Sequence, residues 1–100
     1  MSGIVPVDRD RRLVGGDDVA AQARAVFENM AEVLAAAGCT FADVVKVTVF
    51  LTDVDDRPLV NPVREEVFGA TRPASTLVEV SALVIPGARI EVDAIALIPS

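Results

Sequence analysis

The chain has 100 residues and a formal net charge of −6, with no His and a single Cys. An acidic chain without a basic run is poorly suited to nucleic acid or to an anionic membrane surface, so neither is expected as a partner. Without His, the lone Cys39 gives no basis for a zinc or redox-metal site, and we expect no metal and no cofactor. The length predicts one domain over residues 1–100.

The pattern of apolar residues predicts neither a membrane span nor a secretory leader. No apolar run approaches the roughly 18 residues of a spanning helix, and the N-terminus lacks a charged segment followed by an apolar one. A single Cys cannot form an internal disulfide, which suits a reducing compartment. We therefore expect a cytoplasmic protein.

The first part of the chain predicts the end of a short strand at residues 4–7 and then an amphipathic helix. Asp18 is expected as the helix N-cap, because a carboxylate there accepts hydrogen bonds from the first free amides. From Val19 onward apolar residues recur at spacings of three and four, and Gly38 ends the helix. The apolar positions are Val19, Ala23, Val26, Phe27, Met30, Val33, Leu34 and Ala37.

A capping box at Thr40–Asp43 is expected to form a single helical turn before a strand over residues 44–51. Alternation in this strand places one set of side chains on a buried face and the other set on the opposite face. The buried set is Val45, Val47, Val49 and Leu51, and the opposite set is Lys46, Thr48 and Phe50.

A second helix is expected to reach Phe68 and to end at Gly69. Pro62 leaves two possible starts, because an interior proline loses a hydrogen bond and clashes with the preceding turn. In one, Asn61 is the N-cap and Pro62 takes the first helical position. In the other, a distorted first turn begins at Asp56.

Two alternating runs follow, one ending at Val80 and one starting at Arg89, on either side of a Pro86-Gly87 turn. We predict two antiparallel strands joined by a long loop. In the second run Ile90, Val92 and Ala94 share one face, and Arg89, Glu91 and Asp93 share the other. Acidic residues at such positions either line a solvated sheet face or mark a functional site.

These two runs resemble the Rid family (RidA/YjgF type, reactive-intermediate deaminases), and the likeness extends over essentially all 100 residues. The matching segments are Pro73-Ala74, Thr76, Val78-Glu79-Val80, residues 90–96, the central strand over residues 43–53, Val60-Asn61 and Ser2-Gly3. The resemblance implies an α+β, chorismate-mutase-like fold, with two helices packed on one face of a mixed sheet. It also implies a homotrimer with a small-molecule cleft between subunits.

The activity implied by the resemblance is hydrolysis of enamines or imines to carbonyl compounds and ammonia. Two departures from the family pattern bear on this. Ser75 stands where the deaminases have the arginine that binds the substrate carboxylate, and the chain begins immediately before the Ser-Gly step, without the usual first strands. We therefore expect an altered substrate, because a serine hydroxyl carries no charge.

The resemblance assigns the catalytic carboxylate to Glu91, which alternatively is an ordinary strand residue in solvent or in a salt bridge. The proposed substrate-binding residues are Ser75, Thr76, Leu77, Asn61, Gly3 and Arg57. Candidate cations to replace the arginine are Arg57, Arg72 and Arg89, each alternatively a surface residue. Arg89 is placed on the strand face of Glu91, where it would neutralise that carboxylate.

Two functions stay open from the sequence. One is an enamine or imine deaminase with an altered substrate, favoured by Glu91 in its motif. The other is a non-catalytic trimeric module that binds a small metabolite or a protein, favoured by Ser75. Ribonuclease activity, an older assignment in the family, is disfavoured because the chain has no His and is acidic.

Overall fold

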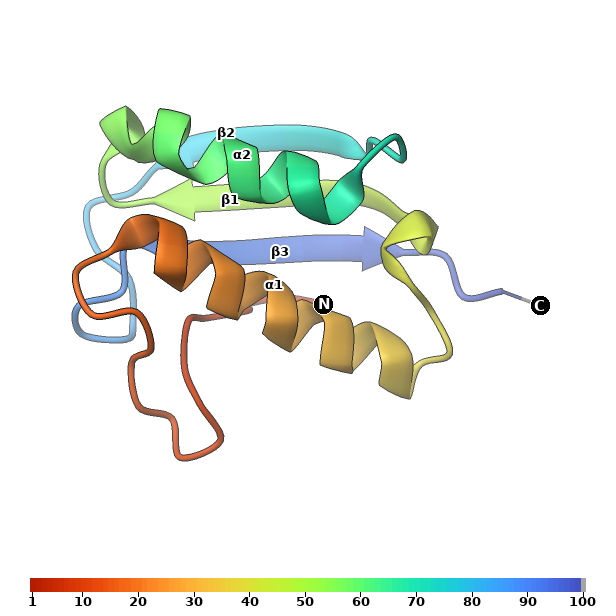
Figure 1. Cartoon of the computed structure of the whole chain (residues 1–100), viewed down its shortest axis with the longest axis horizontal. Helices are drawn as coiled ribbons and strands as arrows, with labels where there is room; N and C mark the ends of the chain where they lie inside the picture. The colour runs from red at the N-terminus through yellow and green to blue at the C-terminus, as the bar shows by residue number, and fades with distance from the viewer. Residues whose placement is uncertain (100) are drawn as a thin grey trace.

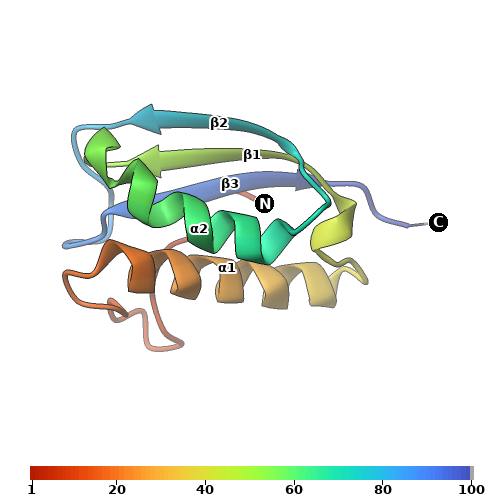
Figure 2. The same cartoon turned by 45° about the horizontal axis from the view of Figure 1, so that its top comes forward.

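The computed structural model describes residues 1–99 as a three-stranded sheet with two helices packed on one of its faces (Figure 1 and Figure 2). The long elements are α1 (Val19–Ala36), β1 (Val44–Leu51), α2 (Arg57–Phe68), β2 (Ala74–Glu79) and β3 (Ile90–Ala96). Single 3₁₀ turns precede β1 at Phe41–Asp43 and α2 at Val54–Asp56. The α+β class and the placement of both helices on one face confirm the predictions. No helix within residues 1–99 is both long enough and apolar enough to span a membrane.

Helix α1 follows the predicted pattern at both ends. The Asp18 side chain accepts hydrogen bonds from the amides of Ala20 and Ala21, and Gly38 follows the last turn with φ of 74°. Of the predicted apolar stripe, Val33 is 43% exposed, and Ala37 is also exposed. These two positions of the stripe therefore lie outside the core, whereas Leu34 in the same part of the helix is buried.

Strand β1 is the centre of the sheet, whose order is β2-β1-β3. It pairs in parallel with β2 and antiparallel with β3. The predicted hairpin between the last two strands is therefore wrong, because residues 80–89 carry the chain across to the other edge of β1. The Val80 amide still bonds to the Leu51 carbonyl, whereas the Arg89 carbonyl accepts from the Thr52 amide. Both ends of this connection are fixed at the same end of β1.

The faces of the strands agree with the predicted alternation except at the start of β1. Val47, Val49 and Leu51 are fully buried under the helices. The register with β3 shifts between Val44 and Lys46, which is a β-bulge. Val44 is buried instead, and Val45 is 42% exposed, so its predicted place on the buried face was wrong.

Helix α2 begins at Arg57, so the start at Asn61 was wrong and the earlier start was correct. Pro58 lies in the first turn, where its missing N–H costs nothing, and Pro62 lies inside the helix. Asp56 occupies the N-cap position but makes no capping hydrogen bond. The predicted end at Phe68 and Gly69 is confirmed.

The two helices and the turn before β1 meet in an aromatic cluster. Phe68 of α2 contacts Phe27 of α1 and Phe41 edge-to-face, with ring centroids 5.9 and 5.4 Å apart. The capping box predicted at Thr40–Asp43 is confirmed and holds Phe41 in its turn. This packing fixes the C-terminal end of α2 against the rest of the core.

The beginning of the chain covers the outer edge of β3. Ile4 and Val92 exchange two backbone hydrogen bonds, and the Met1 amine donates to the Ala94 carbonyl. The short strand end predicted at residues 4–7 is reduced to isolated bridges, from Ile4 to Val92 and from Val7 to Leu13.

A buried polar network joins α1 to the connection between β2 and β3. Gln22 is fully buried and donates to the carbonyls of Gly16 and Gly87, while its side-chain oxygen accepts from the Arg89 amide. The Arg89 guanidinium bonds to both carboxylate oxygens of buried Asp56 at 2.8 Å. This ion pair explains why Asp56 does not cap α2.

Candidate functional site

The sheet face opposite the helices carries the acidic residues of the predicted site. Pairing across the three strands sets its side chains in rows. The rows are Val78, Phe50 and Glu91; then Thr76, Thr48 and Asp93; then Ala74, Lys46 and Ile95. Glu91 and Thr76 therefore share this open face, which the helices do not cover (Figure 2).

Glu91 lies half-buried on the open face, next to Phe50 in the neighbouring strand. Burial raises the pKa of the Glu91 carboxyl above its ordinary value, and the nearby negative charge of Asp93 raises it further. Asp93 in turn accepts a 2.6 Å hydrogen bond from the Gly3 amide. The structure thus brings Gly3 to Asp93, two residues along β3 from Glu91.

Ser75 lies on the other side of the sheet. It is in register with buried Val47, so its side chain points to the helix side, where it accepts a short hydrogen bond from Arg64 of α2. Within one chain, the sheet therefore separates Ser75 from Glu91. Leu77 shares the helix side with Ser75 and packs against the core.

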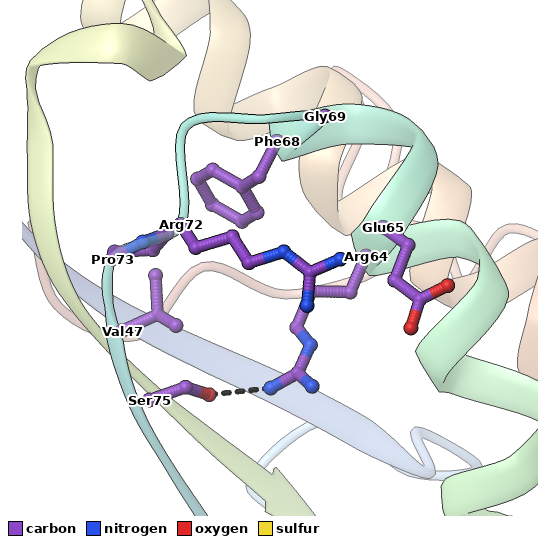
Figure 3. Close-up of a pocket in the computed structure, with 8 residues that line it drawn as sticks. All are labelled: Val47, Arg64, Glu65, Phe68, Gly69, Arg72, Pro73 and Ser75. Atoms are coloured by element: carbon purple, nitrogen blue, oxygen red, sulfur yellow. Dashed lines mark hydrogen bonds between the residues drawn. The ribbon is translucent and has the colours of Figure 1, made fainter.

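A cavity of about 230 Å³ opens beside Ser75, between the second half of α2 and the start of β2 (Figure 3). Its lining combines three charged side chains with apolar ones: Val47, Arg64, Glu65, Phe68, Gly69, Arg72, Pro73 and Ser75. Figure 3 shows both guanidinium groups directed into this cavity, with that of Arg64 reaching Ser75. Among residues 1–99, neither Arg64 nor Arg72 has a carboxylate within 4.0 Å.

Arg64 is the residue that the sequence reasoning missed. Its signal was present, because positions 60, 64 and 68 lie along one stripe of a helix, and Val60 and Phe68 are buried. Of the three predicted cations, only Arg72 lines the cavity. Arg89 pairs with Asp56 and Asp17 rather than neutralising Glu91, so that prediction was wrong.

The remaining predicted residues belong to α2. Arg57 is exposed at the start of the helix, one turn before Asn61. The side-chain oxygen of Asn61 is buried without a hydrogen-bond partner within residues 1–99. An unpaired buried acceptor is costly, which makes Asn61 an uncommon feature of this helix.

Proteins of known sequence and structure resemble this chain over nearly all of its length. The family model described as Endoribonuclease L-PSP matches residues 1–98. Human 2-iminobutanoate/2-iminopropanoate deaminase is 38% identical over 97 residues, which cover 97% of this chain and 70% of that protein. The 3-aminoacrylate deaminase RutC of Acinetobacter baylyi is 41% identical over 96 residues, covering 96% of this chain and 75% of that protein.

The crystal structure of the YjgF gene product from E. coli agrees with the fold, with a TM-score of 0.88 at 40% identity. That match covers 97% of this chain and 77% of the E. coli chain. These likenesses confirm the predicted fold family as well as the sequence resemblance. The chain belongs to the Rid family.

Proposed function

We propose that this protein hydrolyses a small enamine or imine to a carbonyl compound and ammonia, in a cleft between subunits of a homotrimer. The observation that carries the proposal is Glu91, a half-buried carboxylate with a raised pKa, in the motif by which the chain resembles the Rid deaminases. The two relatives named above as deaminases support the same reaction class.

The reaction asks the protein mainly to move protons. An enamine first takes a proton on carbon to become the imine, and water then adds to the C=N carbon. The resulting carbinolamine loses its C–N bond as the nitrogen leaves as ammonia, so imine and water give a carbonyl compound and ammonia. Glu91 is suited to take a proton from the attacking water and return it to the departing nitrogen, because a raised pKa brings its two protonation states closer in energy near neutral pH.

The two faces of the sheet support the proposal of an inter-subunit cleft. Ser75 and Glu91 lie on opposite faces, so one small molecule can contact both only if they come from different copies of the chain. In this proposal Gly3 lies beside the acidic pair, since its amide bonds to Asp93, and Thr76 lies in the same row of the sheet with Thr48 between it and Asp93. Asn61, Leu77 and Arg57 are proposed to contact the ligand from the helix side.

The substrate is proposed to differ from those of the arginine-bearing deaminases. A bidentate contact between arginine and carboxylate contributes about 1.5–3 kcal/mol that a serine hydroxyl at position 75 does not supply. The same substitution favours the second candidate, a trimeric module that binds a small metabolite or a protein without catalysis. Both candidates use the same cleft and differ in whether Glu91 acts on a bound imine.

Ammonia release from freshly generated 2-aminoacrylate, and in parallel from an imine of similar size without a carboxylate, tests the proposal. The intact chain is expected to accelerate the release, and Glu91→Gln is expected to abolish that acceleration while leaving the fold intact. Glu32→Gln, a change of the same kind at an exposed position of α1, serves as the matched control and should be fully active. Equal rates for the intact chain and Glu91→Gln would reject the deaminase and leave the binding module.

A further inference from the structure

We propose that Arg64, assisted by Arg72, binds the carboxylate of a small monocarboxylate ligand in the cavity beside Ser75. The cation of this site would then come from α2 and the loop after it, and not from strand β2. This inference rests on the proposed function for the identity of the reaction, but the binding step can be measured without any turnover.

Arg64 is unusual among the eight arginines of the chain. Only Arg64 and Arg89 are partly buried, and the others are exposed. The charge of Arg89 is neutralised by Asp56 and Asp17. Arg64 has only the hydroxyl of Ser75 as a hydrogen-bond partner among residues 1–99, so its partly desolvated charge lacks a counter-ion.

The position of Arg64 is fixed by the packing of its helix. Val60, Val63 and Phe68 are all buried, and Phe68 is held in the aromatic cluster. The guanidinium therefore extends from a rigid element toward Ser75, and its planar fork has further N–H groups to donate to a carboxylate. Ser75 takes part by orienting the guanidinium, a role that needs a hydroxyl and no charge.

The charges of the cavity match a single negative charge. Arg64 and Arg72 contribute two positive charges and Glu65 one negative charge, which leaves +1. The volume of 230 Å³ corresponds to about seven or eight water molecules at roughly 30 Å³ each, which suits a metabolite of a few heavy atoms. Val47 and Phe68 supply an apolar wall for a short aliphatic group.

Titration with pyruvate, followed by calorimetry, tests the assignment. Pyruvate is the carbonyl product expected from 2-aminoacrylate, and hydroxyacetone has the same skeleton without the carboxylate. We expect the intact chain to bind pyruvate and to show no binding of hydroxyacetone at the same concentration. Arg64→Gln should weaken pyruvate binding about tenfold or more, and Arg72→Gln by a smaller factor, because a charged contact is worth roughly one decade or more.

Two control variants isolate the effect of Arg64. Arg24→Gln removes an exposed arginine from α1, away from the cavity, and should change pyruvate affinity less than about twofold. The double variant Ser75→Arg with Arg64→Gln returns a guanidinium to the cavity from β2 and should recover most of the lost affinity. Each variant is checked for an unchanged melting temperature, so that a loss of binding is not a loss of folding.

The outcomes separate this inference from the proposed reaction. Pyruvate binding that depends on Arg64 in a protein without turnover keeps the inference and rejects the deaminase. Turnover that depends on Glu91 but not on Arg64 keeps the deaminase and overturns the inference. Equal binding of hydroxyacetone, or tighter binding of malonate or inorganic phosphate than of pyruvate, overturns the assignment of a monocarboxylate.

Discussion

Gln22→Met should lower the free energy of unfolding more than an ordinary substitution at the surface does. The side chain of Gln22 is fully buried and makes hydrogen bonds of 2.7, 3.1 and 2.7 Å to Gly16, Gly87 and Arg89. Methionine has nearly the same length and no strong donor or acceptor, so it removes all three bonds with little change in volume.

The size of the effect follows from what each freed group can do. A hydrogen bond contributes about 1 kcal/mol net, which gives roughly 3 kcal/mol for the three bonds. Gly16 and Gly87 are exposed, so their carbonyls can turn to water. The Arg89 amide is partly buried just before β3 and loses its hydrogen-bond partner. This cost offsets the gain from burying the more apolar methionine, so the expected loss of stability stays at about 3 kcal/mol.

Urea unfolding at matched protein concentration measures this change, with Arg24→Met as the control on the exposed side of the same helix. The control should stay within about 0.5 kcal/mol of the unmodified chain. Hydrogen exchange of the Arg89 amide should also quicken in the Gln22 variant only. A loss below about 1 kcal/mol at unchanged m-value would refute the reasoning, because the three backbone groups would then have found other partners.

Three further outcomes follow from other features. Folding raises the pKa of Glu91 above its ordinary value of 4.5, so its ionised form lowers the stability of the fold. Glu91→Gln should therefore raise the melting temperature at pH 7, and this gain should fade as the pH falls toward 4.5. Gly15→Ala should lower the free energy of unfolding in urea more than Gly16→Ala does. A Cβ at Gly15 would lie 2.8 Å from the Gln22 amide nitrogen, whereas a Cβ at Gly16 would point into open space. If the site combines Glu91 of one subunit with Arg64 of another, an equal mixture of Glu91→Gln and Arg64→Gln chains, unfolded and refolded together, should regain about one quarter of the activity. One site in four then receives both intact residues. No recovery would place both residues in one subunit's site.

The sequence was sufficient for the elements whose signals are local. The caps at Asp18, Thr40 and Gly38 were found because a capping residue acts on amides or carbonyls within a few positions of itself. The buried faces of β1 and β3 were found because alternation reports burial directly. The bulge at Val45 was missed, since an extra residue in a strand depends on its partner and leaves no trace in the strand's own pattern.

Strand pairing was the main feature that the sequence did not provide. A strand's alternation is the same whichever neighbour it pairs with, so β2 and β3 looked like a hairpin although β1 lies between them. The ten residues from Val80 to Arg89 are long enough to cross the end of β1. For Arg64 the helix stripe was readable from the sequence, but its proximity to Ser75 was not, because that depends on how α2 lies over the parallel pair of strands.

The central position of β1 also has a consequence for synthesis of the protein. Once α2 and β2 have been made, the parallel β1-α2-β2 unit can form, but the other edge of β1 stays unpaired until residues 90–96 follow. That edge belongs to an apolar, β-branched strand, which is the kind of surface that recruits another chain. Strand β3 thus protects this edge within the same chain, and a nascent chain stalled before residue 90 would leave the edge open to pairing with another chain.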